Sequence, residues 1–417
     1  MTEHVVTPDG YWILEEGIWA KTANKQAHGI VISDSVVMGD VIQNIILNDP
    51  EYVANAVKQT LANLGFNGGE HPSSLNNSNK IQIDHTLTLA DTIANQGINL
   101  DGWTEISLGY ACELEDDLQI WARIHFEKAL KFGKEHQDLR LQLHAELGIA
   151  ILELKSGKLN IAERACKRIQ LEFKKSNDDV GLSNAEEILG LIAYSRGDYN
   201  LSKSLHENAL ELRKEIGYED GVVTSIVNLG NVAMSQGKIN QASDLFSDVN
   251  LEDQSERDEA QLLCSRGVNE MQKANIPKAL NLINKSLEIR NKINDKTGQA
   301  ECYNYLGTAY MMQGNFHKGR DVCRKALKIA DSLSVNGAKA HALYHMGQAS
   351  IGMGDMNSGV DEIKRARGLF SKCGDRAGVS NCNSMLRKLE IYDVEMLLEP
   401  KVLVSIGVIV FLIILMI

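Results

Sequence analysis

The sequence is poor in proline and in runs of positive charge. Only five of its 417 residues are proline, and because proline breaks helix interiors, this scarcity favours long helices. Lys and Arg number 43 against 55 Asp and Glu, which gives a net charge of −12 spread along the chain. An acidic chain without a basic stripe lacks the phosphate-binding surface that nucleic acids require, so we expect no nucleic-acid partner.

The seven cysteines include no Cys-x-x-Cys pair and lie far apart. This pattern favours free buried thiols in a reducing compartment over disulfides or a zinc site. Cys166 and Cys323 occupy the same position in the repeat described below, as do Cys302 and Cys382, which indicates packing roles. A charged-then-apolar leader is also missing from the N-terminus, so we expect no secretion by a cleaved signal.

Signatures of catalysis and cofactor binding are missing as well. The Gly-Lys pairs in SGKLN (156–160) and QGKIN (236–240) lack the spacing and the Ser or Thr of a phosphate-binding loop. His341 and His345 have the spacing of a metal pair on one helix face, but no third ligand accompanies them. The carboxylate cluster ELEDD (113–117) is typical of a solvated turn. We therefore expect no enzyme activity, no cofactor and no metal.

What the chain does contain is a repeat. The stretch NYLGTAYMMQGNFHKG (304–319) recurs with its apolar and small residues in the same places. Its leading glycines are separated by 40, 37, 40 and 40 residues: Gly190, Gly230, Gly267, Gly307 and Gly347. A second small residue follows each of them seven positions later. We predict about seven units, beginning near residues 103, 143, 183, 223, 260, 300 and 340, and a closing helix near 380. Such a period indicates a stacked-repeat architecture.

Each unit is expected to be a pair of helices, helix A and helix B, joined by a tight turn. The leading glycine lies in helix A, where a missing side chain lets helix B approach closely. The second small residue and the Asp or Asn behind it suit the turn between the helices. Because no unit buries its faces alone, stacking of neighbours closes the core. We interpret these glycines as packing and turn elements.

The repeat resembles the tetratricopeptide repeat. In YLGTAYMMQGNFHKGRDVCRKAL (305–327) every position matches the pattern of that family by residue type, with Gly319 in place of the usual alanine. The resemblance covers about residues 103–390. The usual period of the family is about 34 residues, whereas here it is 40, as it is in long-helix members such as kinesin light chains. We expect the extra residues to lengthen helix B and its loop. The implied fold is all-α over most of the chain, a right-handed α-solenoid of about seven helix pairs.

The resemblance also implies a concave groove, lined by the A helices, that binds peptide or protein partners. The candidates by family position are Asn184, Tyr194, Asn228, Asn231, Met234, Met271, Asn304, Thr308, Met311, Tyr344 and Gln348. Asn228 and Asn231 are the best single choice, because an amide that both donates and accepts can bind an extended peptide backbone. The alternative is that the Asn residues are only solvated and that the Met residues fill gaps between units. The basic residues that hold a partner's C-terminal carboxylate in some members are not found in successive units.

Outside the repeats, residues 1–65 are expected to form a small N-terminal β-hairpin and helix region. TPDGYWILEEGIWAK (7–21) predicts the hairpin, the Val- and Ile-rich segment 29–47 predicts two more strands, and residues 48–65 predict a helix with Pro50 in its first turn. Residues 66–80 are rich in Asn, Ser and Gly and predict a flexible linker. The solenoid with its capping helices is placed at 81–399, and a helix near 84–97 is expected to cover the first repeat.

Residues 400–417 are predicted to be a C-terminal transmembrane anchor. Sixteen residues from Val402 to Ile417 carry no charge, and as a helix they span about 24 Å, somewhat less than the roughly 30 Å of a hydrocarbon core. The anchor residues singled out are Val402, Leu403, Ile406, Val410, Phe411, Leu412, Ile413 and Leu415. Because nothing N-terminal directs translocation, we expect a single-pass, C-terminally anchored protein with the repeats in the cytoplasm.

Three functional hypotheses follow from the sequence. The first is a membrane-anchored interaction scaffold whose partners are proteins or peptides in the groove and the lipid bilayer at the C-terminus. The second is a signalling or regulatory sensor, in which the N-terminal region binds a ligand or self-associates through strand edges and the solenoid relays it. The third, an enzyme with its site within residues 1–102, ranks last because that region lacks paired acid and base residues.

Overall fold

The structure, a computed structural model, describes residues 3–7, 10–15, 18–22, 50–63, 86–87, 90, 99–249 and 255–397. Several predicted segments lie outside these residues: the strands within 29–47, the linker at 66–80, most of the helix near 84–97, and the apolar run 402–417. Three strands form an antiparallel sheet in the order β1 (Glu3–Thr7), β2 (Gly10–Glu15) and β3 (Ile18–Thr22). In the register, Thr7 pairs with Gly10 and Glu15 with Ile18.

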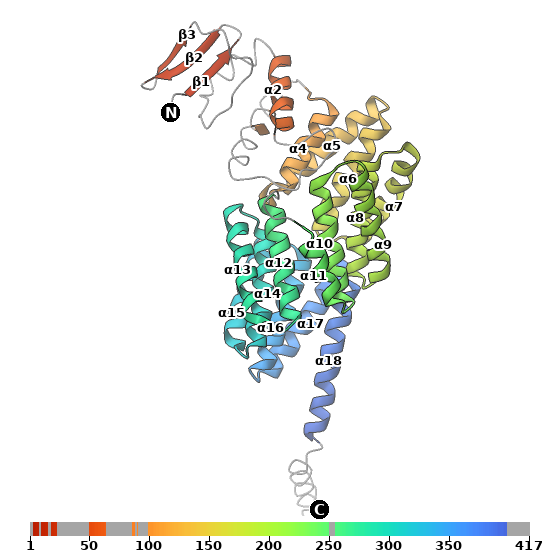
Figure 1. The fold of residues 1–417 in the computed structure, drawn as a ribbon, viewed down its shortest axis with the longest axis vertical. Coiled ribbons are helices and arrows are strands. Elements are labelled where there is room, and N and C mark those ends of the chain that lie inside the picture. The colour runs from red at the N-terminus through yellow and green to blue at the C-terminus, as the bar shows by residue number, and fades with distance from the viewer. Residues whose placement is uncertain are drawn as a thin grey trace, which may run out of the picture.

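From residue 99 onward, the described chain is a stack of helix pairs (Figure 1). The A helices are α4 (Gly102–Glu113), α6 (Leu139–Lys155), α8 (Asp179–Ser195), α10 (Glu219–Ser235), α12 (Glu256–Gln272), α14 (Lys296–Met312) and α16 (Asn336–Gly352). The B helices are α5 (Gln119–Glu135), α7 (Leu159–Ser176), α9 (Tyr199–Glu215), α11 (Ile239–Ser247), α13 (Ile276–Lys292), α15 (Phe316–Ser332) and α17 (Met356–Cys373). A short 3-10 helix, η1 (Asp116–Leu118), precedes α5, and α18 (Arg376–Leu397) closes the stack. The predicted all-α solenoid is confirmed.

The additional residues of each unit lie in both helices and not in the loops. Helices α6 and α8 have 17 residues each and α7 has 18, while the turns between them span only 156–158 and 177–178. The expectation of a longer loop after helix B is therefore wrong. Short turns suffice because the two helices of a unit have nearly equal lengths, so that their ends lie side by side.

The leading glycines lie where helix B crosses helix A of the same unit. A Cβ built on Gly190 would lie 2.6 Å from the His206 ring, closer than real Cβ contacts. The same relation, glycine to the side chain sixteen residues later, holds for Gly230 and Phe246, Gly267 and Ile283, Gly307 and Cys323, and Gly347 and Ile363. The predicted packing role of these glycines is confirmed.

The second small residue of each unit forms the turn in a left-handed backbone conformation. The φ angle is 74° at Gly157, 77° at Gly197 and 85° at Gly354. In the fifth unit the position is occupied by Ala274, with a φ of 62°. Because a Cβ clashes with the backbone in this region, alanine is strained where glycine is not.

Two local features depart from the regular stack. Helix α11 has nine residues where most B helices have 17, and it belongs to the unit whose leading glycine lies only 37 residues before the next one. Before the first unit, α2 (Pro50–Asn63) begins at the proline predicted to start it. Val57 and Leu61 of α2 are buried in one cluster with Ile106 and Leu108 of α4. Helix α2 therefore covers the exposed end of the first unit.

Ala274→Gly is expected to stabilise the protein by about 0.5–1 kcal/mol, because glycine relieves the positive-φ strain at a small entropic cost. Urea unfolding followed by circular dichroism measures the change. The matched control is Ala165→Gly within α7, where the same substitution should cost about 1 kcal/mol. Equal destabilisation by both changes would contradict the assignment.

Stability is expected to depend on the protonation of His206. This side chain is 1% exposed, and burial lowers the pKa of His206 to about 4, below the value of about 6.5 in an unfolded chain. The folded state therefore binds its proton less readily, and stability that is complete above pH 6.5 falls by about 3 kcal/mol as the pH approaches 4.

His206→Phe tests this dependence, because Phe246 fills the same position in the next unit. Denaturant titrations between pH 4 and 7 should give a flatter stability profile for the variant than for the parent. His317→Gln, at an exposed position, should retain the parental slope. A parental slope in His206→Phe would rule out His206 as the source.

Candidate partner-binding surface

The A helices form the inner surface of the solenoid. Helix A of each unit packs against helix A of the next, as between α6 and α8 and between α14 and α16. Within the described residues, successive B helices contact each other less, so they splay apart on the outer side. This difference curves the stack, because the layer with the closer contacts lies on the inside of the bend.

The solenoid returns on itself, so that its first unit contacts the fifth and sixth. Arg257, in the first turn of α12, donates a hydrogen bond from Nη2 to the carbonyl oxygen of Leu114 at 2.7 Å. Thr297, in the first turn of α14, donates from its backbone nitrogen and from Oγ1 to the two carboxylate oxygens of Asp116, both at 2.8 Å. We call this set of contacts the seam.

A second group of contacts continues the seam toward the end of the stack. A Cβ on Gly157, in the turn of the second unit, would lie 3.1 Å from the Cys373 sulfur at the end of α17. One on Gly197, in the turn of the third unit, would lie 3.9 Å from Ala377 in α18. Each turn thus meets an element about five units further along. The second and third units therefore lie against the end of the stack, α17 and α18.

Tyr194 of α8 lies where several units meet. Its hydroxyl is 2.7 Å from the Ser235 hydroxyl of α10. Burial raises the pKa of Tyr194, and the carboxylates of Glu301 in α14 and Asp375 before α18 act in the same direction, against the opposing hydrogen bond with Ser235. The pKa of this half-buried phenol thus depends on groups from the third, fourth and sixth units and on the residue just before the closing helix.

A second polar group joins α14 and α16. Thr308 Oγ1 lies 3.2 Å from His345 Nδ1, and the same ring nitrogen lies 3.0 Å from Gln348 Oε1. Asn304 is 7% exposed, and within the described residues its Oδ1 has no hydrogen-bond partner. This oxygen is a buried acceptor beside the inner surface.

The predicted groove residues divide by exposure. Six of them are half-buried on the A helices: Tyr194, Asn231, Thr308, Met311, Tyr344 and Gln348. Five are buried: Asn184, Asn228, Met234, Met271 and Asn304. Of the preferred pair, Asn228 is 6% exposed, so only Asn231 presents its amide at the surface. Met234 and Met271 lie within apolar clusters, in agreement with a gap-filling role.

Asn184 belongs to a buried polar group that the sequence did not indicate. Its Oδ1 accepts a hydrogen bond at 2.8 Å from Arg213 Nη2, which also pairs with Glu187. Arg213 Nη1 donates to Gly221 O and Ser225 Oγ, both at 2.9 Å. Arg213 occupies the repeat position that Phe173 and Phe370 occupy in other units, as does Arg290. A sequence signal for this group was present, since the position holds Gly133, Phe173, Ala330 or Phe370 in other units and a charged side chain in these two.

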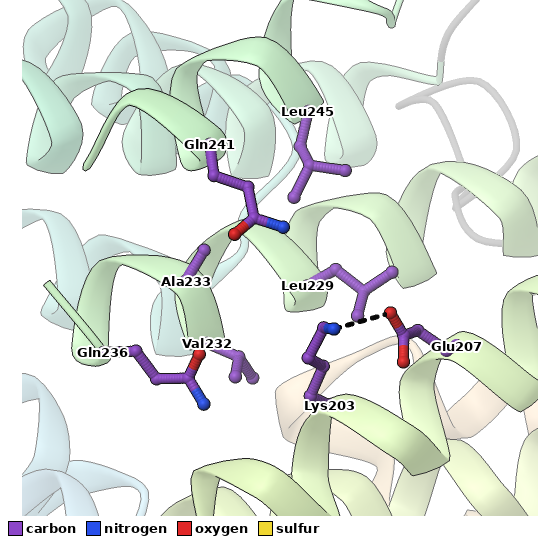
Figure 2. A pocket seen from close by; sticks show the side chains of 8 residues that line it. All are labelled: Lys203, Glu207, Leu229, Val232, Ala233, Gln236, Gln241 and Leu245. Atoms are coloured by element: carbon purple, nitrogen blue, oxygen red, sulfur yellow. Dashed lines mark ion pairs between the residues drawn. The ribbon is translucent and has the colours of Figure 1, made fainter. Parts of the chain in front are cut away.

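The outer surface carries a shallow cleft between the third and fourth units (Figure 2). One side holds Lys203 and Glu207 of α9, which form an ion pair at 3.1 Å, and the other side holds Gln241 and Leu245 of α11. Leu229, Val232, Ala233 and Gln236 complete its lining. The two charged residues of the cleft already pair with each other, and its lining residues contain no arrangement of acid, base and nucleophile.

Metal ligands do not cluster in the part of the chain that the structure describes, where no group of three or more His, Cys, Asp or Glu could hold an ion. The predicted histidine pair has separate partners. The His341 ring meets Phe370 edge-on at 4.8 Å between centroids, whereas His345 contacts Thr308 and Gln348. None of the described helices is long and apolar enough to cross a membrane. The segment predicted as an anchor, Val402–Ile417, lies outside the described residues.

Comparison with known proteins agrees with the repeat geometry. The family model of the tetratricopeptide repeat matches residues 300–333, which include most of α14, the whole of α15 and the turn between them. Residues 300–333 are a tetratricopeptide repeat. No curated protein matches the chain.

Several solved structures resemble the chain over most of its length. The Rap conjugation gene regulator of plasmid pLS20, solved with the Phr* peptide, has a TM-score of 0.55 at 14% identity and covers 80% of this chain and 93% of its own. A Rap protein complexed with Competence and Sporulation Factor has a TM-score of 0.51 at 10% identity, over 84% and 99% of the two chains. A signal transduction ATPase with a tetratricopeptide repeat sensor from Pyrococcus horikoshii matches at 16% identity with a TM-score of 0.42, over 62% of this chain and 42% of its own. At such identities the likeness concerns the fold.

The seam predicts an energetic coupling between residues that are 181 positions apart in sequence. Asp116→Ala and Thr297→Val should each reduce the free energy of unfolding by about 0.5–1.5 kcal/mol, the usual value of a hydrogen bond. The double variant should lose less than the sum, since both changes remove the hydrogen bond from Thr297 Oγ1 to Asp116. Urea unfolding of the four proteins measures this coupling; Asp244→Ala, at an exposed position, is the control. Strict additivity would show that the seam is open in solution.

Proposed function

We propose that the protein is an interaction scaffold whose inner surface binds an extended peptide or a peptide-like segment of a partner protein. The observation that carries this proposal is the set of half-buried polar side chains on the A helices. Asn231 and Gln348 lie at the same repeat position, one after the leading glycine, and both remain partly exposed inside the curve. Their amides offer the donor and acceptor that a peptide backbone needs.

The physical conditions for peptide binding support the same proposal. The seam holds inner surfaces from distant units near each other, so a bound segment would contact several helices at once. Tyr194 of α8 and Tyr344 of α16 add partly exposed aromatic surface on the A helices, and aromatic residues contribute strongly to binding. The two Rap structures with the same fold were solved with a peptide and with a factor bound, which makes a peptide ligand the first class to test.

A display library of random linear peptides, selected on the full-length protein, tests the proposal. Enriched peptides should bind Asn231→Ala/Gln348→Ala at least tenfold more weakly, about 1.4 kcal/mol, because two amides are removed. Asn281→Ala/Gln241→Ala removes the same side-chain types from the outer surface, where both residues are exposed, and should bind as the parent does. Equal loss in both variants, or no enrichment, would reject the inner surface as the site.

We further propose that residues 400–417 anchor this scaffold in a membrane, with the repeats on the cytoplasmic side. The support is the uncharged apolar sequence itself. In cells, the full chain should stay in the membrane pellet after an alkaline wash, whereas a chain ending at Glu399 should be soluble. Release of the full chain by the wash would refute the anchor.

A regulatory sensor is the second candidate. It is favoured by the likeness to the two Rap proteins, one of which is a conjugation gene regulator, over at least 80% of this chain. In this case residues 1–48 would bind a ligand or self-associate. Removing 1–48 leaves α2 in place on the first unit, and light scattering then compares the oligomeric state. An unchanged oligomeric state and unchanged peptide affinity would count against this candidate.

A further inference from the structure

Two buried cysteines on neighbouring A helices are in direct contact. The sulfur of Cys264 in α12 lies 4.0 Å from the sulfur of Cys302 in α14. Cys264 is 3% exposed and Cys302 is fully buried, within a cluster that includes Ile283 and Leu306. The two residues are 38 positions apart in sequence, so only the stacking of the fifth and sixth units brings them together.

The surroundings of the pair are polar on one side. Ser286 Oγ lies 3.3 Å from the Cys302 sulfur and donates its own proton to the Ala260 carbonyl at 2.6 Å. The buried guanidinium of Arg290, which pairs with Glu301 at 3.0 Å, also belongs to this region. Hydrogen bonding within the thiol pair lowers the pKa of Cys302 and raises that of Cys264, and Arg290 also favours the Cys302 thiolate. The two sulfurs are therefore chemically unequal.

We propose that Cys264 and Cys302 form a reversible intramolecular disulfide when the protein meets a hydroperoxide, and that this bond links the fifth unit covalently to the sixth. A disulfide needs its sulfurs about 2.05 Å apart. The 4.0 Å contact must therefore shorten by about 2 Å, and rotation of the side chains about their Cα–Cβ bonds is the movement that this step uses. This proposal is independent of the proposed peptide site.

The chemistry balances with hydrogen peroxide as the two-electron oxidant. The Cys302 thiolate attacks one peroxide oxygen; the O–O bond breaks, an S–O bond forms, and the departing hydroxide takes up a proton to become water. The Cys264 sulfur then attacks the Cys302 sulfenic acid, an S–S bond forms, and the S–O bond breaks to release a second water. The protein loses two hydrogens, and a thiol reductant restores both thiols.

The bond would act on the inner surface through helix α14. Along the same helix, Cys302 lies two residues before Asn304, about one turn before Leu306 and six residues before Thr308. A covalent link to α12 fixes the spacing of these two A helices, which the reduced protein holds only by packing. The oxidised protein should therefore unfold at a higher temperature than the reduced one, with the increase lost on addition of a reductant.

The test treats the full-length protein with hydrogen peroxide and measures its intact mass and its free thiols. The expected product is about 2 Da lighter and has lost two of its seven thiols. Digestion without a reductant should yield a linked peptide pair containing Cys264 and Cys302. Dimedone, which captures sulfenic acids, should label Cys302 in a Cys264→Ala variant, because the second thiol is then missing.

Cys302→Ala is the companion variant, and it should form no linked pair. Alanine is the natural residue at the same repeat position in the third and seventh units, as Ala185 and Ala342. The helices of the variant are therefore expected to remain folded, which circular dichroism checks. Cys323→Ala, a buried cysteine on helix B, should form the disulfide as the parent does. A disulfide between other cysteines, or seven intact thiols after peroxide has oxidised free glutathione in the same solution, would overturn the proposal.

Discussion

The close approach of helix B to helix A at one glycine per unit sets the geometry of the whole solenoid. At Gly190 and Gly230 a side chain would overlap the aromatic ring sixteen residues later, so the missing Cβ fixes how deeply the two helices interlock. Because the same contact recurs at intervals of 37 or 40 residues, each unit has nearly the same shape, and the small rotation between units accumulates. The curvature that brings the first unit against the fifth and sixth follows from this repetition.

The seam changes what kind of surface the solenoid presents. In an open stack each A helix would face solvent, but here Tyr194 is influenced by Glu301 and Asp375 from units far along the chain. Polar groups that the sequence separates by more than a hundred residues thus share one region. A segment bound there would meet side chains from several units, which favours recognition of an extended chain over recognition of a single small group.

Positions at which a unit departs from its neighbours hold the buried charged residues and the cysteine pair of the solenoid. Arg213 and Arg290 stand where other units have an uncharged residue such as Phe173 or Ala330, and they bring buried charge between units. The contact of Cys264 with Cys302 lies near Arg290. Buried charges need partners, so these residues recruit Asn184, Glu187 and Glu301 into fixed positions. Such positions constrain the A helices as strongly as the apolar core does, and they couple the inner surface to the packing behind it.

The sequence by itself determined the helix pairs, their number and their turns. Glycine at Gly197 or Gly354 and the recurring apolar positions of each unit act through local backbone and packing preferences. The sequence also indicated eleven candidate groove residues on the A helices, of which six, Asn231 and Gln348 among them, are partly exposed. Only the tertiary structure decided that Asn228 is buried, that Asp116 meets Thr297, and that Cys264 meets Cys302. These outcomes depend on the angle between successive units summed over several repeats, and no residue pattern within one unit encodes that sum.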